Sequence, residues 1–226
     1  MGKDFSPKIR QRADLSRKQA RRAGYDRLLI VCEGTKTEPN YFKEIRQAYR
    51  LHTANVAIYP STSGTAPIQV VQHARELVEN GNVHRNIKPR AVEQVYVLFD
   101  RDAHVSFHDA CQLARSLDGK ILNDNGQPII FRAIVSVPCF ELWLLLHFEN
   151  IERSLHNVEI LKRLKSHLPS YEKAIVNSFA LARHKLDVAH QRARTLIERH
   201  TPIDGIQPYT NISLLVTSLI ELRNDS

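Results

Sequence analysis

The chain has 226 residues, of which 42% are apolar and 25% are charged, and its formal net charge at pH 7 is +8. This length suits one domain with a helical addition, and the composition excludes collagen-like, wholly disordered and disulfide-framework proteins. Because the three cysteines are few and scattered, and no apolar run approaches the roughly 20 residues of a membrane span, we expect a reduced, cytoplasmic protein without a membrane segment.

The positive charge is concentrated in residues 1–24, which hold eight basic and two acidic residues, a net charge of +6. The remaining residues carry only +2, so the body of the chain is close to neutral. Two interpretations stay open: a flexible, solvated arm, or an arm that contacts phosphates or an acidic partner.

The first predicted element is a buried strand at 27–32, in which a continuous apolar run follows Arg27 and stops at Glu33 and Gly34. A polar turn follows, and Thr37 is placed to cap a helix whose first turn contains Pro39.

Strands and helices then alternate along the chain. Strands are predicted at 55–60, 94–99 and 129–135, and helices at 66–80 and 105–117. Connections of this kind are right-handed crossovers between parallel strands. We therefore expect an α/β fold with a Rossmann-like core and a mainly parallel four-stranded sheet.

From Pro138 onward the pattern is helical, with amphipathic stretches at 156–168, 170–200 and 207–223. The predicted organisation has three parts: a basic, flexible arm (1–24), a core (25–150) and a helical extension packed on that core (151–226).

Acidic residues follow two of the predicted strands directly: Glu33 ends the first, and Asp100 and Asp102 end the third. The carboxyl ends of parallel strands meet at one edge of a sheet, where ligands of such folds bind. Crowded carboxylates repel one another and need protons or a cation, and an oxygen-only donor set suits Mg²⁺ or Mn²⁺. The pattern favours phosphoryl-transfer chemistry, in which such an ion bridges phosphate oxygens and lowers the pKa of water.

The turn after Glu33 has features of a phosphate-binding loop. Gly34 lets the backbone approach a phosphate closely, and Lys36 can neutralise its charge. The loop is not a Walker A motif, because the Gly-Lys-Ser/Thr order and the upstream glycine are missing. We therefore expect no ATP hydrolysis by this chain.

Three separated segments resemble one known family. The strand-Glu33-Gly34 and Asp100-x-Asp102 pattern is similar to the Toprim domain of topoisomerases, primases and OLD-type nucleases. More closely, 30–42, 99–104 and 138–148 resemble the RloB-like family. The resemblance implies a Toprim-like core, a bacterial role in phage defence, and a partner ATPase of ABC/SMC type encoded nearby, together equivalent to an OLD nuclease split into two polypeptides.

The resemblance also implies roles for individual carboxylates. Glu33 is expected to be the Toprim glutamate, and Asp100 and Asp102 the Asp-x-Asp pair that binds Mg²⁺ around a phosphodiester. OLD-type Toprims add a second acid after the glutamate, for which Glu38 is the candidate; its alternative role is favourable charge at a helix N-terminus.

Glu141 is unusual because it lies within an otherwise apolar segment. It either completes a second metal position or acts as a general base, or else it caps its own helix or pairs with an arginine such as Arg132.

Two further residues flank the aspartates. His104 can orient water, protonate a leaving oxygen or contact phosphate, or it is an ordinary loop histidine. Arg101 is expected either to form a buried ion pair or to contact the substrate.

The leading hypothesis is a Mg²⁺- or Mn²⁺-dependent Toprim-type nuclease that acts in anti-phage defence by abortive infection. Its expected partners are nucleic acid (DNA or RNA, tRNA included) and the ATPase, and a homodimer is left open. A HAD-type phosphatase is disfavoured because that motif would place Thr or Val at position 104. The alternative is a non-catalytic regulatory module that binds nucleic acid or the ATPase.

Overall fold

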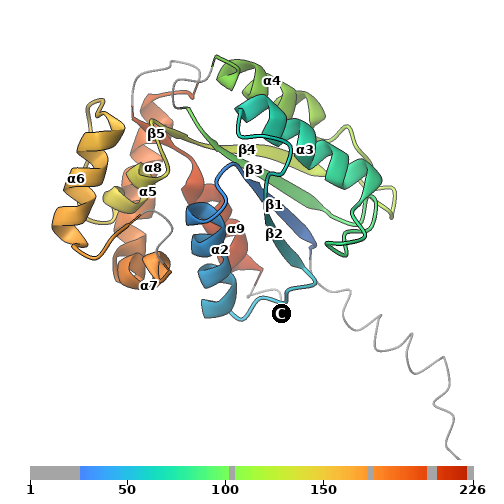
Figure 1. The fold of residues 1–226 in the computed structure, drawn as a ribbon, viewed down its shortest axis with the longest axis horizontal. Helices are drawn as coiled ribbons and strands as arrows, with labels where there is room; N and C mark the ends of the chain where they lie inside the picture. The colour runs from blue at the N-terminus through green and yellow to red at the C-terminus, as the bar shows by residue number, and fades with distance from the viewer. Residues whose placement is uncertain (1–25, 102–104, 173–175, 203–207, 223–226) are drawn as a thin grey trace, which may run out of the picture.

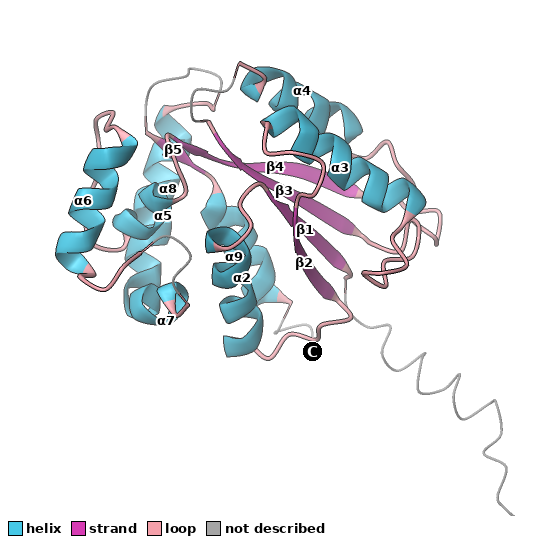
Figure 2. Ribbon diagram, viewed as in Figure 1, coloured by secondary structure: helices cyan, strands magenta, loops and turns pink. Residues whose placement is uncertain are grey.

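The computed structural model describes residues 26–101, 105–172, 176–202 and 208–222, which form a five-stranded sheet with helices on both faces (Figures 1 and 2). The strands lie in the order β2-β1-β3-β4-β5, and all neighbours are parallel except β4 and β5. The strands are β1 (Leu28–Cys32), β2 (Val56–Pro60), β3 (Gln94–Asp100), β4 (Ile130–Val137) and β5 (Tyr209–Thr210). The α/β prediction and the mainly parallel sheet are confirmed.

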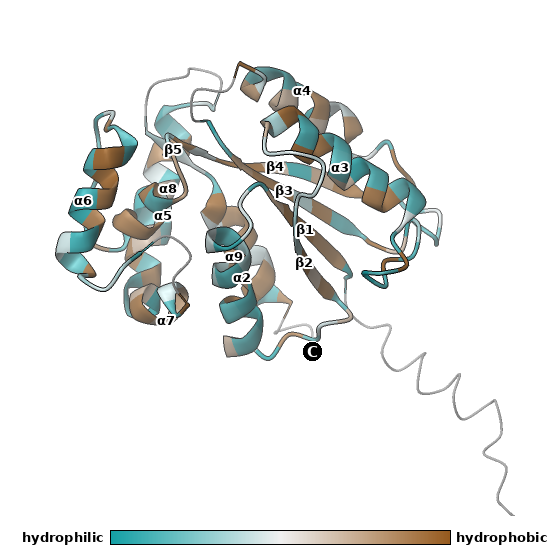
Figure 3. Cartoon of the chain, viewed as in Figure 1, coloured by the Kyte–Doolittle hydropathy of each residue, from teal (hydrophilic) through white to brown (hydrophobic). Residues whose placement is uncertain are grey.

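Strand β1 is apolar throughout, and β3 is apolar between Gln94 and Asp100, because helices cover both faces of these strands. Side chains of β1 alternate, with Leu28, Ile30 and Cys32 facing one hydrophobic core and Leu29 and Val31 the other. In the hydropathy colouring these strands are brown over most of their length (Figure 3). The apolar runs of the sequence therefore located the strands to within a residue or two.

Helices α3 and α4 cover one face of the sheet, and the remaining helices lie on the other side (Figure 1). The helical elements are α2 (Thr37–Ala48), α3 (Pro67–Asn80), α4 (Phe107–Leu117), α5 (Glu141–Leu146), α6 (Asn157–His167), α7 (Ser178–Ala182), the 3₁₀ turn η1 (Arg183–Lys185), α8 (Leu186–Arg199) and α9 (Ile212–Glu221). Side chains from α6, α8 and α9 share one core with α2, α5 and the sheet. No helix among the described residues is long and apolar enough to cross a membrane.

The structure differs from the sequence predictions in three places. A fifth strand, β5, pairs antiparallel with the end of β4, so the prediction of four strands was one too few. The stretch 170–200 is not one helix: α7 begins after Asn177, which adopts a left-handed conformation (φ 82°), and the 3₁₀ turn η1 separates α7 from α8. Thr37 begins α2 rather than capping it, and Lys36 occupies the cap position without a side-chain cap.

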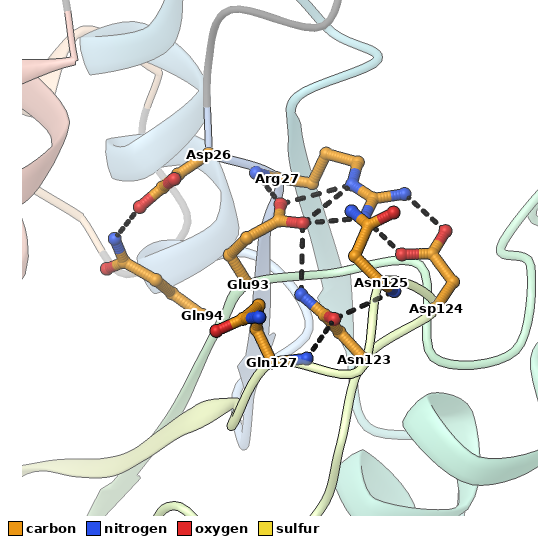
Figure 4. A network of polar contacts seen from close by, with 8 residues as sticks. All are labelled: Asp26, Arg27, Glu93, Gln94, Asn123, Asp124, Asn125 and Gln127. Atoms are coloured by element: carbon orange, nitrogen blue, oxygen red, sulfur yellow. Dashed lines mark hydrogen bonds and ion pairs between the residues drawn. The ribbon is translucent and has the colours of Figure 1, made fainter.

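A polar network ties the amino ends of the strands together at the edge opposite Glu33 and Asp100 (Figure 4). Arg27, directly before β1, contacts Glu93 at 2.6 Å and Asp124 at 2.5 Å. The backbone amide of Arg27 also donates to Glu93, at 2.6 Å. Asn123 joins the network through its side-chain amide, which donates to Glu93 at 3.4 Å. The network fixes the starts of β1 and β3 against the loop before β4.

Candidate functional site

The carboxyl ends of β1 and β3 lie side by side and bring Glu33 to Asp100. Cys32 is in register with Leu98, and the Glu33 amide donates to the Leu98 carbonyl at 2.9 Å. The Glu33 carboxylate then accepts a hydrogen bond from the Asp100 amide at 3.0 Å. Two residues that are 67 positions apart in the sequence thus meet at the predicted edge of the sheet.

The Asp100 side chain faces the turn that follows β4. Its Oδ2 accepts a hydrogen bond from the Phe140 amide at 3.0 Å. Burial and the charges of Glu38, Glu141 and Glu33 raise the pKa of Asp100 well above its ordinary value, against the opposing effect of the Phe140 bond. Asp100 is therefore the centre of a crowded group of carboxylates, and holding it ionised requires a compensating cation.

Glu38 belongs to this group although it lies in the first turn of α2. Its side chain is buried, and its carboxyl group fills the space where Gly34 lacks a Cβ. Its charge raises the pKa of Asp100 and contributes to the raised pKa of the Cys32 thiol, which burial dominates. The Glu38 carboxyl group thus faces the strand ends. If its role were only to place negative charge at the N-terminus of α2, it could face solvent instead.

Glu141 reaches the same edge from the start of α5. It is buried, and its Oε1 accepts a hydrogen bond from the Tyr171 hydroxyl at 3.3 Å. Burial and the charges of Glu141 and Asp100 raise the pKa of the Cys139 thiol, so this thiol stays protonated beside them. The suggested pairing of Glu141 with Arg132 is wrong, because Arg132 lies exposed near the amino end of β4, at the opposite end of that strand.

The predicted phosphate-binding residues are only partly brought together. Gly34 lies beside Glu38, and Lys36 is exposed at the start of α2. The Arg101 guanidinium lies over the Phe107 ring at 5.8 Å, and its Nη1 is buried without a hydrogen-bond partner among the described residues. No ion pair links Arg101 to a described residue, so the expected buried pair is not found in this part of the chain.

Two predicted site residues, Asp102 and His104, lie outside the described residues. Among the residues that are described, no group of three His, Cys, Asp or Glu side chains is arranged to hold a metal ion. The donor chemistry of the site nevertheless fits a hard divalent cation, because carboxylates from four positions gather at one edge. The residues that could contribute are Glu33, Glu38, Asp100 and Glu141, together with Asp102.

Tyr171 is a member of the site that sequence reasoning missed. It is fully buried, and the nearby charges of Glu141 and Glu38 add to the effect of burial in raising the pKa of its phenol. It lies in a segment predicted only as part of a long amphipathic helix, and a single tyrosine there gives no sequence signal. Its role depends on the packing of α6 and its following turn against α5.

Two cavities among the described residues lie away from the carboxylates. One, of about 240 Å³, lies between α4, β4 and α9, and is lined by Cys111, Arg115 and Leu214 among others. The other, of about 580 Å³, lies between α8 and α9. Neither cavity is lined by any of the four clustered carboxylates, so the candidate site is identified by the chemistry of its side chains.

Comparison with known proteins gives one match. A model of the protein family described as RloB-like protein matches residues 28–219, which include the four clustered carboxylates and Tyr171. No curated protein and no solved structure matches the chain.

Proposed function

Because the chain belongs to the RloB-like protein family, we propose that it is a Mg²⁺-dependent nuclease of the Toprim type, which hydrolyses phosphodiester bonds of nucleic acid. The observation that supports this best is the meeting of Glu33 and Asp100 at the carboxyl edge of a parallel sheet. Such an edge is where ligands bind in open α/β sheets.

The chain's own residues have distinct roles in this proposal. Glu33, Asp100 and Asp102 hold Mg²⁺ or Mn²⁺, and Glu38 and Glu141 complete its surroundings. A bound ion of this kind neutralises phosphate charge and lowers the pKa of the attacking water. The carboxylates in turn keep the ion at the strand ends, where burial and the neighbouring carboxylates raise the pKa of Asp100.

Phosphate contacts come from the residues around this acidic centre. Gly34 allows close approach of a phosphate to the backbone, and Lys36 supplies an exposed positive charge on the same loop. Arg101, which follows Asp100 in the chain, is proposed as a further phosphate contact through Nη1, which has no hydrogen-bond partner among the described residues. His104 is proposed as a phosphate contact or proton donor for the leaving oxygen.

In the cell, we propose a role in anti-phage defence together with an ABC/SMC-type ATPase encoded nearby. Membership of the RloB-like family supports this proposal. The loop after Glu33 is not a Walker A motif, so the proposal assigns ATP hydrolysis to the partner. Nucleic acid, either DNA or RNA, is the proposed substrate.

A second candidate is a non-catalytic module that binds nucleic acid or the ATPase. The observation that favours it is that no three of the described acidic, His or Cys side chains are arranged to hold a metal. Under this hypothesis, nucleic-acid binding would survive Glu33→Gln and no cleavage would accompany it.

The test is cleavage by the purified protein of plasmid DNA, single-stranded DNA and total tRNA in Mg²⁺ or Mn²⁺, with and without the neighbouring ATPase. We expect at least one substrate to be cut, with loss of cutting in EDTA and in Glu33→Gln. Glu79→Gln is the matched control, because Glu79 lies on the surface of α3 and pairs with Arg75 at 3.0 Å. Cleavage that persists in Glu33→Gln, or no cleavage of any substrate with the ATPase present, would overturn the nuclease proposal.

A further inference from the structure

The Tyr171 hydroxyl lies outside the acidic cluster but bonds directly to one of the clustered carboxylates. It donates to Glu141 Oε1 at 3.3 Å. Tyr171 follows α6 in the chain, and its own amide donates to the Leu168 carbonyl at 2.8 Å, which fixes the turn that carries it. The phenol therefore enters the site from the helical region and not from the sheet.

A tyrosine at this position serves more than packing. Tyr171 has no exposed surface and belongs to the hydrophobic core shared by α2, α5 and α6, where a phenylalanine would bury the same ring. A buried hydroxyl is costly unless it has a partner, and here its partner is a carboxylate. The hydroxyl is thus placed specifically against Glu141.

Glu141 needs such a donor because its neighbours repel it. The charges of Glu38 and Glu141 both act on Asp100, so the three carboxyl groups are close enough to interact. A glutamate side chain has three rotatable bonds, and repulsion alone would turn its carboxylate away from the cluster. A fixed donor on one oxygen opposes that rotation.

We propose that Tyr171 is a positioning residue, whose hydroxyl holds the Glu141 carboxylate in the orientation that receives a divalent cation at the sheet edge. This inference rests on the proposed metal-dependent function and adds to it a named contribution from the helical region. Partners that orient metal ligands commonly change metal affinity by about 10–100-fold when they are removed.

A second set of hydrogen bonds links the helical region to α2, the helix that carries Glu38. The Glu44 carboxylate accepts hydrogen bonds from the amides of Asn177 at 2.5 Å and Phe179 at 2.9 Å, at the start of α7. Glu38 lies on the same helix as Glu44, less than two turns earlier. The segments on both sides of 173–175 are therefore anchored, one by Tyr171 to Glu141 and the other by Glu44.

The test is the binding of Mn²⁺ to the full chain, measured by electron paramagnetic resonance of the free ion, so that no cleavage assay is needed. Tyr171→Phe removes only the hydroxyl and is expected to weaken Mn²⁺ binding about tenfold. Tyr41→Phe is the matched control. Tyr41 is equally buried, and its hydroxyl accepts a hydrogen bond from Trp143 Nε1 at 2.7 Å in the core. It should lower stability but change Mn²⁺ affinity less than twofold.

The double variant Tyr171→Phe/Glu141→Gln separates positioning from general destabilisation. If Tyr171 acts through Glu141, adding Tyr171→Phe to Glu141→Gln should cause no further loss of affinity. The inference would be overturned if Tyr171→Phe weakened Mn²⁺ binding equally in the wild type and in Glu141→Gln. It would also be overturned if Tyr171→Phe bound Mn²⁺ as the wild type does while Glu141→Gln bound it weakly. Failure of Glu33→Gln and Glu141→Gln to weaken Mn²⁺ binding would instead refute the metal site of the proposed function.

Discussion

Replacing Gly34 with alanine is expected to impair metal-dependent activity strongly while leaving the fold intact. A Cβ at position 34 would lie 2.8 Å from both Cδ and Oε1 of Glu38, and nearer still to Oε2. Ordinary contacts of a Cβ begin near 3.4 Å, so the Glu38 carboxyl group must retreat by roughly 1 Å. A misplacement of that size in a catalytic site costs on the order of 100-fold in rate.

The expected cost in stability is small. Gly34 does not have a positive φ, so alanine fits its backbone, and such a change typically stabilises a protein by about 0.4–1 kcal/mol through the unfolded state. Displacing the end of a flexible side chain offsets part of this gain. The free energy of unfolding should therefore change by less than about 1 kcal/mol.

The assay compares cleavage rate, Mn²⁺ affinity and melting temperature in Gly34→Ala and in Gly119→Ala. Gly119 has φ +69° and nothing within 4 Å of a Cβ, so its substitution strains the backbone without touching the site. It should lose about 1–2 kcal/mol of stability and keep its activity. Shortening Glu38 in Gly34→Ala/Glu38→Asp should restore part of the rate, because the shorter side chain clears the new methyl group.

The reasoning would be refuted by a Gly34→Ala protein with the wild-type rate and metal affinity. It would also fail if activity and melting temperature fell together, because that result would make the close approach of Glu38 to Gly34 a structural contact only.

Three other predictions follow from the described contacts. Because the pKa of Asp100 is raised in the folded state, its contribution to stability is fully present below the unfolded-state pKa and is lost as pH rises through the folded-state pKa. The melting temperature in EDTA should therefore fall with rising pH, and Asp100→Asn should make this fall smaller. Removing residues 1–24, which carry +6, should reduce the slope of log K against log salt by about 0.9 for each duplex phosphate they contact, and an unchanged slope would exclude phosphate contact. Arg27→Ala should cost about 2 kcal/mol in denaturant unfolding, with unchanged Mn²⁺ affinity, and an equal loss of affinity would contradict a purely structural network.

The strands could be predicted because each has a sequence pattern of its own. The segment 28–32 is apolar without interruption because both faces of β1 are covered. Glu33 directly follows β1 and Asp100 ends β3, which places both residues at one edge of the sheet. Because the carboxyl ends of parallel strands lie at one edge of a sheet, these two local patterns predict that Glu33 and Asp100 lie close together. This is why the position of Glu33 beside Asp100 could be expected without a structure.

The features that were missed depend on contacts between distant segments. β5 has only two residues, Tyr209 and Thr210, and exists because they pair with the end of β4. Next to it, the Asn211 side chain accepts from the Val135 amide at 2.7 Å and donates to the Ala133 carbonyl at 3.1 Å, continuing the edge without a strand. The bond between Tyr171 and Glu141 likewise spans 30 positions, and no local pattern encodes it.

The Arg27 network has a consequence for the order in which the sheet opens. Opposite charges and satisfied hydrogen bonds hold the amino ends of β1 and β3, whereas like charges crowd their carboxyl ends. A hydrogen-bonded amide exchanges with solvent at a rate set by the opening of lowest free energy that exposes it. In metal-free protein, the Asp100 amide, held by the Glu33 carboxylate, should therefore exchange hydrogen for deuterium well before the Arg27 amide, held by Glu93. The sheet would thus open from its carboxyl edge, and a cation bound there would slow exchange at that edge far more than at the other.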